Sequence, residues 1–248
     1  MHTISWHIGC SGFYYKSWKE VFYPKGYPQK KWFDYYCRHF STIEINNTFY
    51  RFPELQTLKS WYDRSPEAFV FSIKVPRIIT HEQQFVETEL LLQEFYALIH
   101  QGFAEKLGAI LFQLPPHFSY DTEKLHLMIK QLDPAFTNVV EFRNESWWRP
   151  DVYALLQKHN ITFCSVSYPG LTNDVIRNTS TIYYRFHGVP KLYFSEYNTD
   201  FLRHVFHLID EDPKVEKAFL FFNNTAAAAA LPNARYMQEL AQKPNYLL

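Results

Sequence analysis

The chain has 248 residues, and 47% of them are hydrophobic, which is enough for one large domain with a sizeable core. Lysine plus arginine and aspartate plus glutamate both total 25, which excludes the overall basic field that drives non-specific binding to nucleic acid. The three cysteines lie far apart and form no CxxC pair, which disfavours a zinc cage or a disulfide framework. Neither a secretory N-terminus nor an apolar run of roughly 20 residues is present, so we expect a soluble, cytoplasmic protein with no membrane partner.

Apolar runs of strand length alternate with amphipathic segments of helix length along the whole chain. The predicted strands span residues 4–10, 42–46, 69–74, 108–114, 138–143, 162–167, 181–187 and 218–223. The predicted helices span residues 29–40, 53–64, 87–101, 121–132, 151–160, 197–209 and 232–242, and we expect the third to stop at Gly102. After the sixth strand, residues 169–178 lack a clear helical pattern.

Strands that alternate with helices favour right-handed crossovers and a parallel sheet. Eight such units in 248 residues match a closed (β/α)8 barrel. The main rival is an open doubly wound sheet, but no GxGxxG motif for a nucleotide cofactor follows the first strand. The sequence therefore predicts an α/β fold, a single-domain TIM-like barrel of parallel strands over residues 1–248, with a weak or irregular sixth helix.

Polar side chains are predicted to collect inside the barrel at the C-terminal ends of its strands. Successive strand side chains point to opposite faces, and five apolar runs end in a charged or amide residue opposite their bulkiest apolar side chains. If the bulky face meets the helices, the polar face lines the end where barrel enzymes build active sites. The inward set comprises Glu44, Asn46, Lys74, Gln113, Glu141, Arg143, Arg185, His187, Asn223 and Asn224.

The fixed charges of this inward set favour an anion. Lys74, Arg143 and Arg185 supply three positive charges, and two carboxylates, Glu44 and Glu141, leave a net charge of plus one. Buried charges are costly unless they pair, so these groups must pair with each other, with a ligand or with water. The alternative to a functional site is an internal ion-pair network that only closes the top of the barrel.

Several of these residues are candidate catalytic groups. Lys74, flanked by arginines and hydrophobic neighbours, is expected to have a lowered pKa and to act as a base or Schiff-base nucleophile, or else to clamp a phosphate or carboxylate. Glu44 and Glu141 either divide acid and base work or serve as salt-bridge partners, and we favour the second role for at least one of them. His187 is a candidate general acid or base.

A divalent metal is the weaker expectation. Glu44, His81, Glu141 and His187 together offer the carboxylates and imidazoles that such an ion takes. Their spacing contains no HxxxH or DxH signature, and the nearby lysine and arginines oppose a cation. We therefore assign no metal and leave the cofactor unknown.

Aromatic residues are predicted to surround the same opening. Tyr14 and Trp18 follow the first strand, Tyr50 follows the second, and Trp147 follows the fifth. Basic residues lie between them in the sequence, so they are candidates for a platform that stacks on bases or sugars. The alternative is that they plug the mouth or cover hydrophobic surface.

Six ordered segments resemble the signatures of the YecE-like family, domain of unknown function 72. They are IGCSGF at 8–13, EINNTFYR at 44–51, FQLPP at 112–116, EFRNESW at 141–147, YRFHG at 184–188 and FFNN at 221–224. The resemblance covers nearly the whole chain and implies a TIM-like barrel, while the family's activity is unassigned. Two segments depart from the family pattern, namely the polyalanine stretch after Asn224 and Ser165-Val166-Ser167, where relatives often carry an aspartate.

Our first hypothesis is an enzyme that binds a small anionic, phosphorylated or carbohydrate-like ligand at the C-terminal mouth and acts by proton transfer or hydrolysis. Arg143 and Arg185 would hold the anion, and the class would be a hydrolase, or an isomerase or lyase. The alternative is a nucleic-acid-binding protein or nuclease that uses the same aromatic and basic opening. Zero net charge favours the first hypothesis. The oligomeric state is left open.

Overall fold

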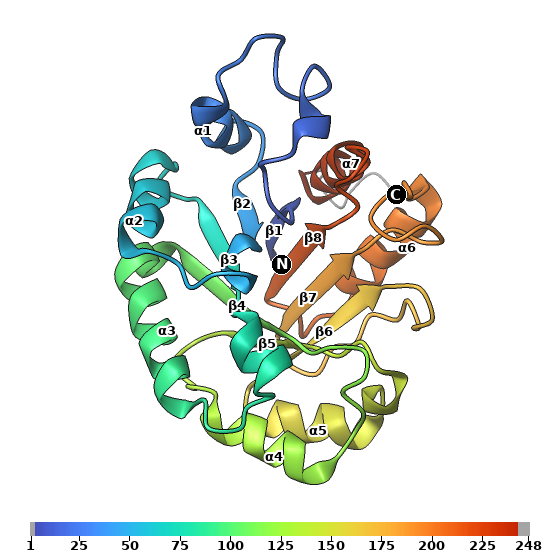
Figure 1. Ribbon diagram of the computed structural model, residues 1–248. Coiled ribbons are helices and arrows are strands. Elements are labelled where there is room, and N and C mark those ends of the chain that lie inside the picture. Colours follow the sequence, from blue (N-terminus) through green and yellow to red (C-terminus); the bar gives the residue numbers. More distant parts are fainter. Residues whose placement is uncertain (1–2, 243–248) are drawn as a thin grey trace.

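Eight parallel strands close into a barrel in chain order in the computed structural model, which describes residues 3–242 (Figure 1). The strands are β1 (Ser5–Cys10), β2 (Thr42–Ile45), β3 (Val70–Lys74), β4 (Leu107–Gln113), β5 (Asn138–Glu141), β6 (Thr162–Ser167), β7 (Thr181–Phe186) and β8 (Lys217–Phe222). Parallel pairing of β1 with β8 closes the barrel. Each predicted strand is therefore confirmed, and the TIM-like barrel with them.

The helices surround this barrel (Figure 1). They are α1 (Trp32–Cys37), α2 (Leu55–Arg64), α3 (Glu89–Phe103), α4 (Thr122–Gln131), α5 (Pro150–Lys158), α6 (Thr199–Asp210) and α7 (Ala230–Gln242). Residues 168–180, all of which are described, contain no helix, which confirms the irregular segment after the sixth strand. Within residues 3–242, no helix combines the length and the apolarity needed to cross a membrane.

Gly102 does not end α3, contrary to the prediction, because the helix continues to Phe103. A Cβ atom at position 102 would lie 2.5 Å from the Leu58 Cβ atom of α2, closer than two carbon atoms can approach. The glycine therefore permits close packing of α2 against α3 instead of stopping the helix.

Two apolar layers lie on the two faces of the strands. The residues predicted to face the helices all belong to the outer layer: Ile43, Ile45, Phe71, Ile73, Val140, Phe142, Tyr184 and Phe186. A second cluster, which includes Leu111, Val139, Val166 and Phe221, comes from the opposite faces of the strands and fills the barrel interior. Polar side chains at the strand ends form the layer above this interior cluster.

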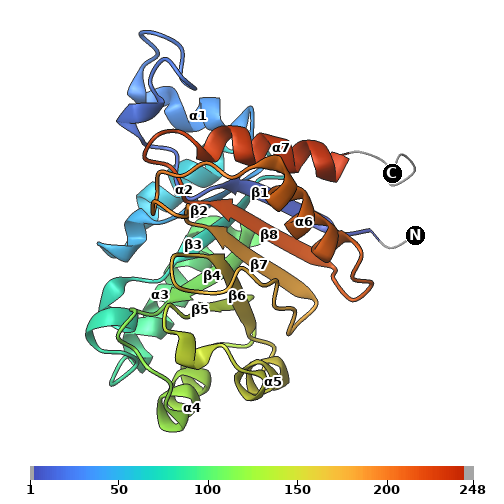
Figure 2. The same ribbon diagram turned by 90° about the vertical axis from the view of Figure 1, so that its right-hand side faces the viewer.

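All strands run in the same direction (Figure 2). The polar layer lies at their C-terminal ends. The long segment between β1 and β2, which includes α1, projects beside this end next to the N-terminal part of α7 (Figures 1 and 2). The opening of the barrel is therefore bordered by loops from several strands, as in other barrels of this class.

Candidate functional site

A buried ion network occupies the centre of the polar layer. Arg185, near the end of β7, reaches both inward carboxylates. Its Nη2 atom lies 2.7 Å from Glu44 Oε1, and its Nη1 atom lies 2.5 Å from Glu141 Oε2. All three side chains are at most 1% exposed. One guanidinium thus binds two carboxylates from strands that are not neighbours in the barrel, which offsets the cost of burying them.

Glu44 accepts further hydrogen bonds at this position. Ser11 Oγ and Tyr183 Oη each donate to its carboxylate over 2.6 Å, and Asn46 Nδ2 donates over 3.0 Å. Burial alone would raise the pKa of Glu44, but the charge of Arg185 and these hydrogen bonds lower it below its ordinary value. Glu44 is therefore a fixed carboxylate, held by two hydroxyls that we did not predict.

Glu141, the last residue of β5, binds a second arginine and a histidine. Arg143 Nε lies 2.7 Å from Glu141 Oε1, and His187 Nε2 lies 3.2 Å from the same atom. Although burial opposes ionisation, the charges of Arg185 and Arg143 hold the pKa of Glu141 well below its usual range. Both predicted carboxylates thus serve as ion-pair partners, which we favoured for at least one.

His187 is fixed as a neutral imidazole. Burial lowers its pKa to about 3, although the Glu141 carboxylate opposes this shift. Nε2 lies 3.2 Å from Glu141 Oε1 and 3.5 Å from Arg185 Nη1, and Nδ1 lies 3.0 Å from Asn223 Nδ2. Both ring nitrogens are therefore committed to protein partners, an arrangement that suits an orienting role better than proton exchange with a substrate.

We expect the free energy of unfolding to fall as pH drops below the ordinary histidine pKa of 6.5, because the unfolded chain then binds a proton that folded His187 refuses. The contribution of His187 is roughly 1.4 kcal/mol per pH unit down to its folded pKa of about 3. Urea denaturation between neutral pH and about pH 4 measures this slope. His187→Asn should reduce the pH dependence of the unfolding free energy by the uptake of one proton. The exposed His204→Asn variant is the control for loss of an imidazole. Equal slopes in parent and His187→Asn would contradict the assignment.

Lys74, the last residue of β3, differs from the other charged groups because it has no carboxylate partner among residues 3–242. Its Nζ atom donates to the neutral Gln113 Oε1 over 2.7 Å and lies 3.7 Å from the centre of the Phe49 ring. Burial lowers the pKa of Lys74 to about 7, and the charges of Arg185 and Arg143 add to this shift. Lys74 is therefore a desolvated amine that is only part protonated at neutral pH.

Gln113 is held in a fixed orientation beside Lys74. Its Nε2 atom donates to the Leu114 carbonyl over 2.6 Å and lies 3.4 Å from His81 Nε2. His81 belongs to a π-helical turn, Ile78–Glu82, and its ring packs edge-on against Phe49. Such turns are frequent at functional sites. His81 and the Leu114 carbonyl therefore hold the Gln113 amide so that its Oε1 atom accepts the hydrogen bond from Lys74 Nζ.

Arg143 lies at the rim of the network, with 10% of its side chain exposed. One face of its guanidinium lies over the Tyr168 ring, 4.8 Å from the ring centre. Lys74 and Arg143 are thus the inward cations that reach the surface, while the Glu44–Arg185–Glu141 network beneath them is satisfied internally. With Lys74 protonated, the five groups carry the predicted excess of one positive charge.

The sequence that carries this site matches the model of a known protein family. The model of the family described as "Protein of unknown function DUF72" matches residues 7–247. The chain belongs to this family. The resemblance predicted from the six sequence segments is therefore confirmed, and every residue of the polar layer lies within the matched range.

Named relatives and solved structures agree with this membership. UPF0759 protein YunF of Bacillus subtilis (strain 168) is 26% identical, and the match covers 94% of each chain. UPF0759 protein YecE of Escherichia coli (strain K12) is 27% identical over 46% of this chain and 42% of the relative. A DUF72 family protein from Thermotoga maritima MSB8 has a TM-score of 0.88 at 25% identity and covers 96% of this chain and 100% of its own. A structure from Enterococcus faecalis V583, 19% identical with a TM-score of 0.79, shares the fold. These names give no activity.

Three residues predicted to contact ligand are placed elsewhere in this DUF72 family member. Trp18 is fully buried and donates from Nε1 to the Thr225 carbonyl over 3.0 Å. Trp147 is also fully buried, stacked against Phe142. Asn224 Nδ2 donates to the Ser195 carbonyl and to Asn233 Oδ1, away from His187. The expectation is therefore corrected: these side chains support the loops, because alternation turns Asn224 away from the interior and hydrophobic packing holds both indoles.

The other two aromatic residues of the predicted platform are accessible. Tyr14 is 56% exposed and donates to Gln29 Oε1 over 2.8 Å, while Tyr50 is 76% exposed beside Phe49. Tyr14 lines a cavity next to the polar layer, and Tyr50 lies on the outer surface of the β2 loop. Of the four predicted aromatic residues, two are therefore buried in the hydrophobic packing and two are exposed at the rim of the opening.

The weaker metal set is not assembled by the fold. Across residues 3–242, no group of three or more histidine, cysteine, aspartate or glutamate side chains has a geometry that would hold a metal ion. Glu44 and Glu141 are separated by the Arg185 guanidinium, and His81 contacts Gln113 instead. The arrangement therefore favours anion chemistry over metal ligation at these four residues.

Proposed function

We propose that this DUF72 family member is an enzyme that binds a small anionic substrate over Lys74 and Arg143 at the C-terminal mouth of the barrel. The observation that carries the proposal is the buried Lys74 amine, which has no carboxylate partner among the described residues. A buried ammonium without a counter-ion is costly, and an anionic ligand would supply that counter-ion. Phosphate and carboxylate groups both fit this chemistry.

The chemistry that the site supports best is proton transfer through Lys74. With a pKa of about 7, its amine is present in both protonation states near neutral pH, as an efficient acid-base catalyst should be. The Nζ lone pair would take a proton from a carbon next to a substrate carbonyl, and the resulting ammonium would return it to another atom of the substrate. The commitment of Glu44 and Glu141 to Arg185 weakens the case for a two-carboxylate hydrolysis.

A thermal-shift screen of the purified protein tests the proposal. We expect inorganic phosphate, sugar phosphates or other anionic metabolites to raise the melting temperature, with or without divalent metal, because they bind only the folded protein. Arg143→Met should reduce the shift, whereas Arg203→Met, which removes an exposed guanidinium on α6, should not. Shifts of equal size in parent and Arg143→Met would contradict Arg143 as an anion ligand.

The nucleic-acid alternative makes a different prediction in the same screen. Binding to a phosphate backbone weakens steeply with added salt, so oligonucleotides would shift the melting temperature only at low salt. Against this alternative, Lys74 is 7% exposed and the Arg143 side chain 10%, so these two cations themselves present little surface to a chain of phosphates. The burial of these two cations supports the small ligand instead.

A further inference from the structure

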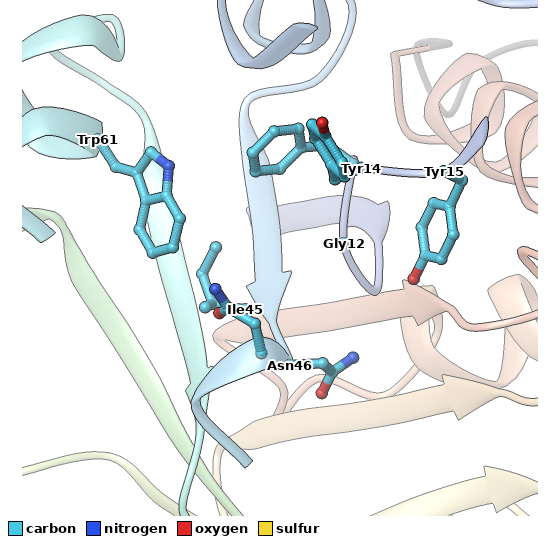
Figure 3. A pocket seen from close by; sticks show the side chains of 8 residues that line it. Gly12, Tyr14, Tyr15, Ile45, Asn46 and Trp61 are labelled. Carbon is cyan, nitrogen blue, oxygen red and sulfur yellow. The ribbon is translucent and has the colours of Figure 1, made fainter. Parts of the chain in front are cut away.

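A cavity of ≈ 410 Å³ lies beside the polar layer, between the loop after β1, the end of β2 and α2. Trp61 and Tyr15 lie on opposite sides of it, and Ile45 and Asn46 lie between them (Figure 3). Its volume falls within the roughly 300–1,000 Å³ of small-molecule pockets. The ionic network occupies a separate part of the barrel mouth, so this cavity is available for another portion of a ligand.

The lining of this aromatic cavity suits an uncharged ring with hydroxyl groups. Its side chains include four aromatic rings and the amides of Asn46 and Asn47, and none of them is charged. Phe13 stands at 90° to Trp61 and at 88° to Tyr14, so the walls present both edges and faces. Phe13 therefore forms no pair of parallel faces with Trp61 or Tyr14 between which a flat base could stack, whereas single ring faces suit the C–H groups of a puckered sugar.

Asn46 connects the aromatic cavity to the ionic network. Its Nδ2 atom faces the Glu44 carboxylate, and because a carboxylate only accepts, the orientation of the amide is fixed. Asn46 Oδ1 is buried and has no hydrogen-bond donor among residues 3–242. A buried acceptor without a donor is unfavourable, and a ligand hydroxyl at Asn46 would provide the donor.

We propose that the aromatic cavity is a carbohydrate subsite, which holds the sugar ring of a substrate whose anionic group lies over Lys74 and Arg143. The position of the anionic group rests on the proposed function, whereas the sugar ring is held by uncharged contacts of its own. Neutral sugars should therefore bind this cavity without Lys74.

Isothermal titration calorimetry with neutral methyl glycosides tests the subsite. We expect one or more of the methyl glucoside, galactoside, mannoside and riboside to bind the parent protein. Trp61→Leu should weaken that binding about tenfold through loss of ring contact. Asn47→Ala should weaken it about threefold through loss of a hydrogen bond, and exposed Asn173→Ala is its matched control.

Lys74→Met separates this proposal from the proposed function. If both hold, Lys74→Met loses phosphate binding and keeps glycoside binding, while Asn47→Ala keeps phosphate binding and binds glycosides about threefold more weakly. Phosphate binding by the parent with no binding of any glycoside up to its solubility limit would overturn the subsite alone. Glycoside affinity that Trp61→Leu and Asn47→Ala leave unchanged, or tighter binding of adenosine and uridine than of every glycoside, would also overturn it.

Discussion

The Lys74→Met variant is expected to lose the stabilisation that phosphate gives to the parent while remaining at least as stable as the parent without ligand. The pKa of Lys74 is about 7 in the folded protein, below its ordinary value of 10.5, so the unfolded chain binds the extra proton between these pH values. This amine therefore costs stability below about pH 10.5, by roughly 1.4 kcal/mol for each pH unit down to the folded pKa, and the cost is largest at and below neutral pH. Methionine has a similar length and no charge to bury, so it removes that cost.

The measurement is a pair of urea denaturation series, with and without phosphate, at about pH 8. Lys130→Met, on the exposed face of α4, is the matched control and should keep the response to phosphate. A Lys74→Met protein that is folded and still stabilised by phosphate as much as the parent would remove Lys74 from the anion site.

Arg185→Met is expected to be the most destabilising substitution in the polar layer. It leaves the Glu44 and Glu141 carboxylates buried without the guanidinium that binds both. Breaking a buried pair in this way costs about 3–5 kcal/mol of unfolding free energy. The loss should shrink as pH falls, because protonation of the carboxylates removes the unpaired charge.

Two further variants show whether this loss comes from unpaired charge. Arg203→Met breaks the exposed Arg203–Asp200 pair, separated by 3.0 Å, and should cost less than about 1 kcal/mol. The triple variant Arg185→Met, Glu44→Gln, Glu141→Gln should recover part of the stability lost by Arg185→Met. A triple variant less stable than Arg185→Met at neutral pH would show that the arginine acts through packing.

The barrel and its inward set were predictable because both depend on local periodicity. Alternation along single strands places Ile43 outside and Glu44 inside, and the same rule holds for Phe142 and Glu141. The prediction did not require knowledge of which strands are neighbours. The order of strands around a parallel barrel follows the chain, so the ends of β2, β3, β5 and β7 had to meet.

Which charged side chains of the site pair with each other was not predictable, because the pairs form between residues on different strands, across the interior of the barrel. Arg185 and Glu44 are 141 residues apart, and no local pattern indicates that one guanidinium binds both glutamates. Tyr183 was overlooked because its ring belongs to the apolar interior, although its hydroxyl reaches Glu44. Ser11 follows the inward alternation of β1, and that signal identifies it in retrospect.

The prediction that two aromatic residues of the loops contact a ligand was wrong for a related reason. Trp18 and Trp147 lie well beyond the ends of β1 and β5, where strand alternation no longer applies, so proximity in sequence to the opening was the only guide for them. Both indoles find backbone acceptors for Nε1 and aromatic neighbours, a combination that usually indicates packing. The glycine at 102 was misread likewise, since its role depends on the neighbouring helix.

Proton uptake on binding of sulfate tests most directly whether an anion binds next to Lys74. Sulfate does not titrate near neutral pH, so any proton taken up must come to the protein. Calorimetry at about pH 8 in two buffers of different ionisation enthalpy should show uptake approaching one proton per sulfate in the parent, because a bound anion raises the pKa of Lys74. Lys74→Met should neither bind sulfate comparably nor take up that proton. Binding without proton uptake, uptake that persists in Lys74→Met, or no binding by the parent would contradict the anion site.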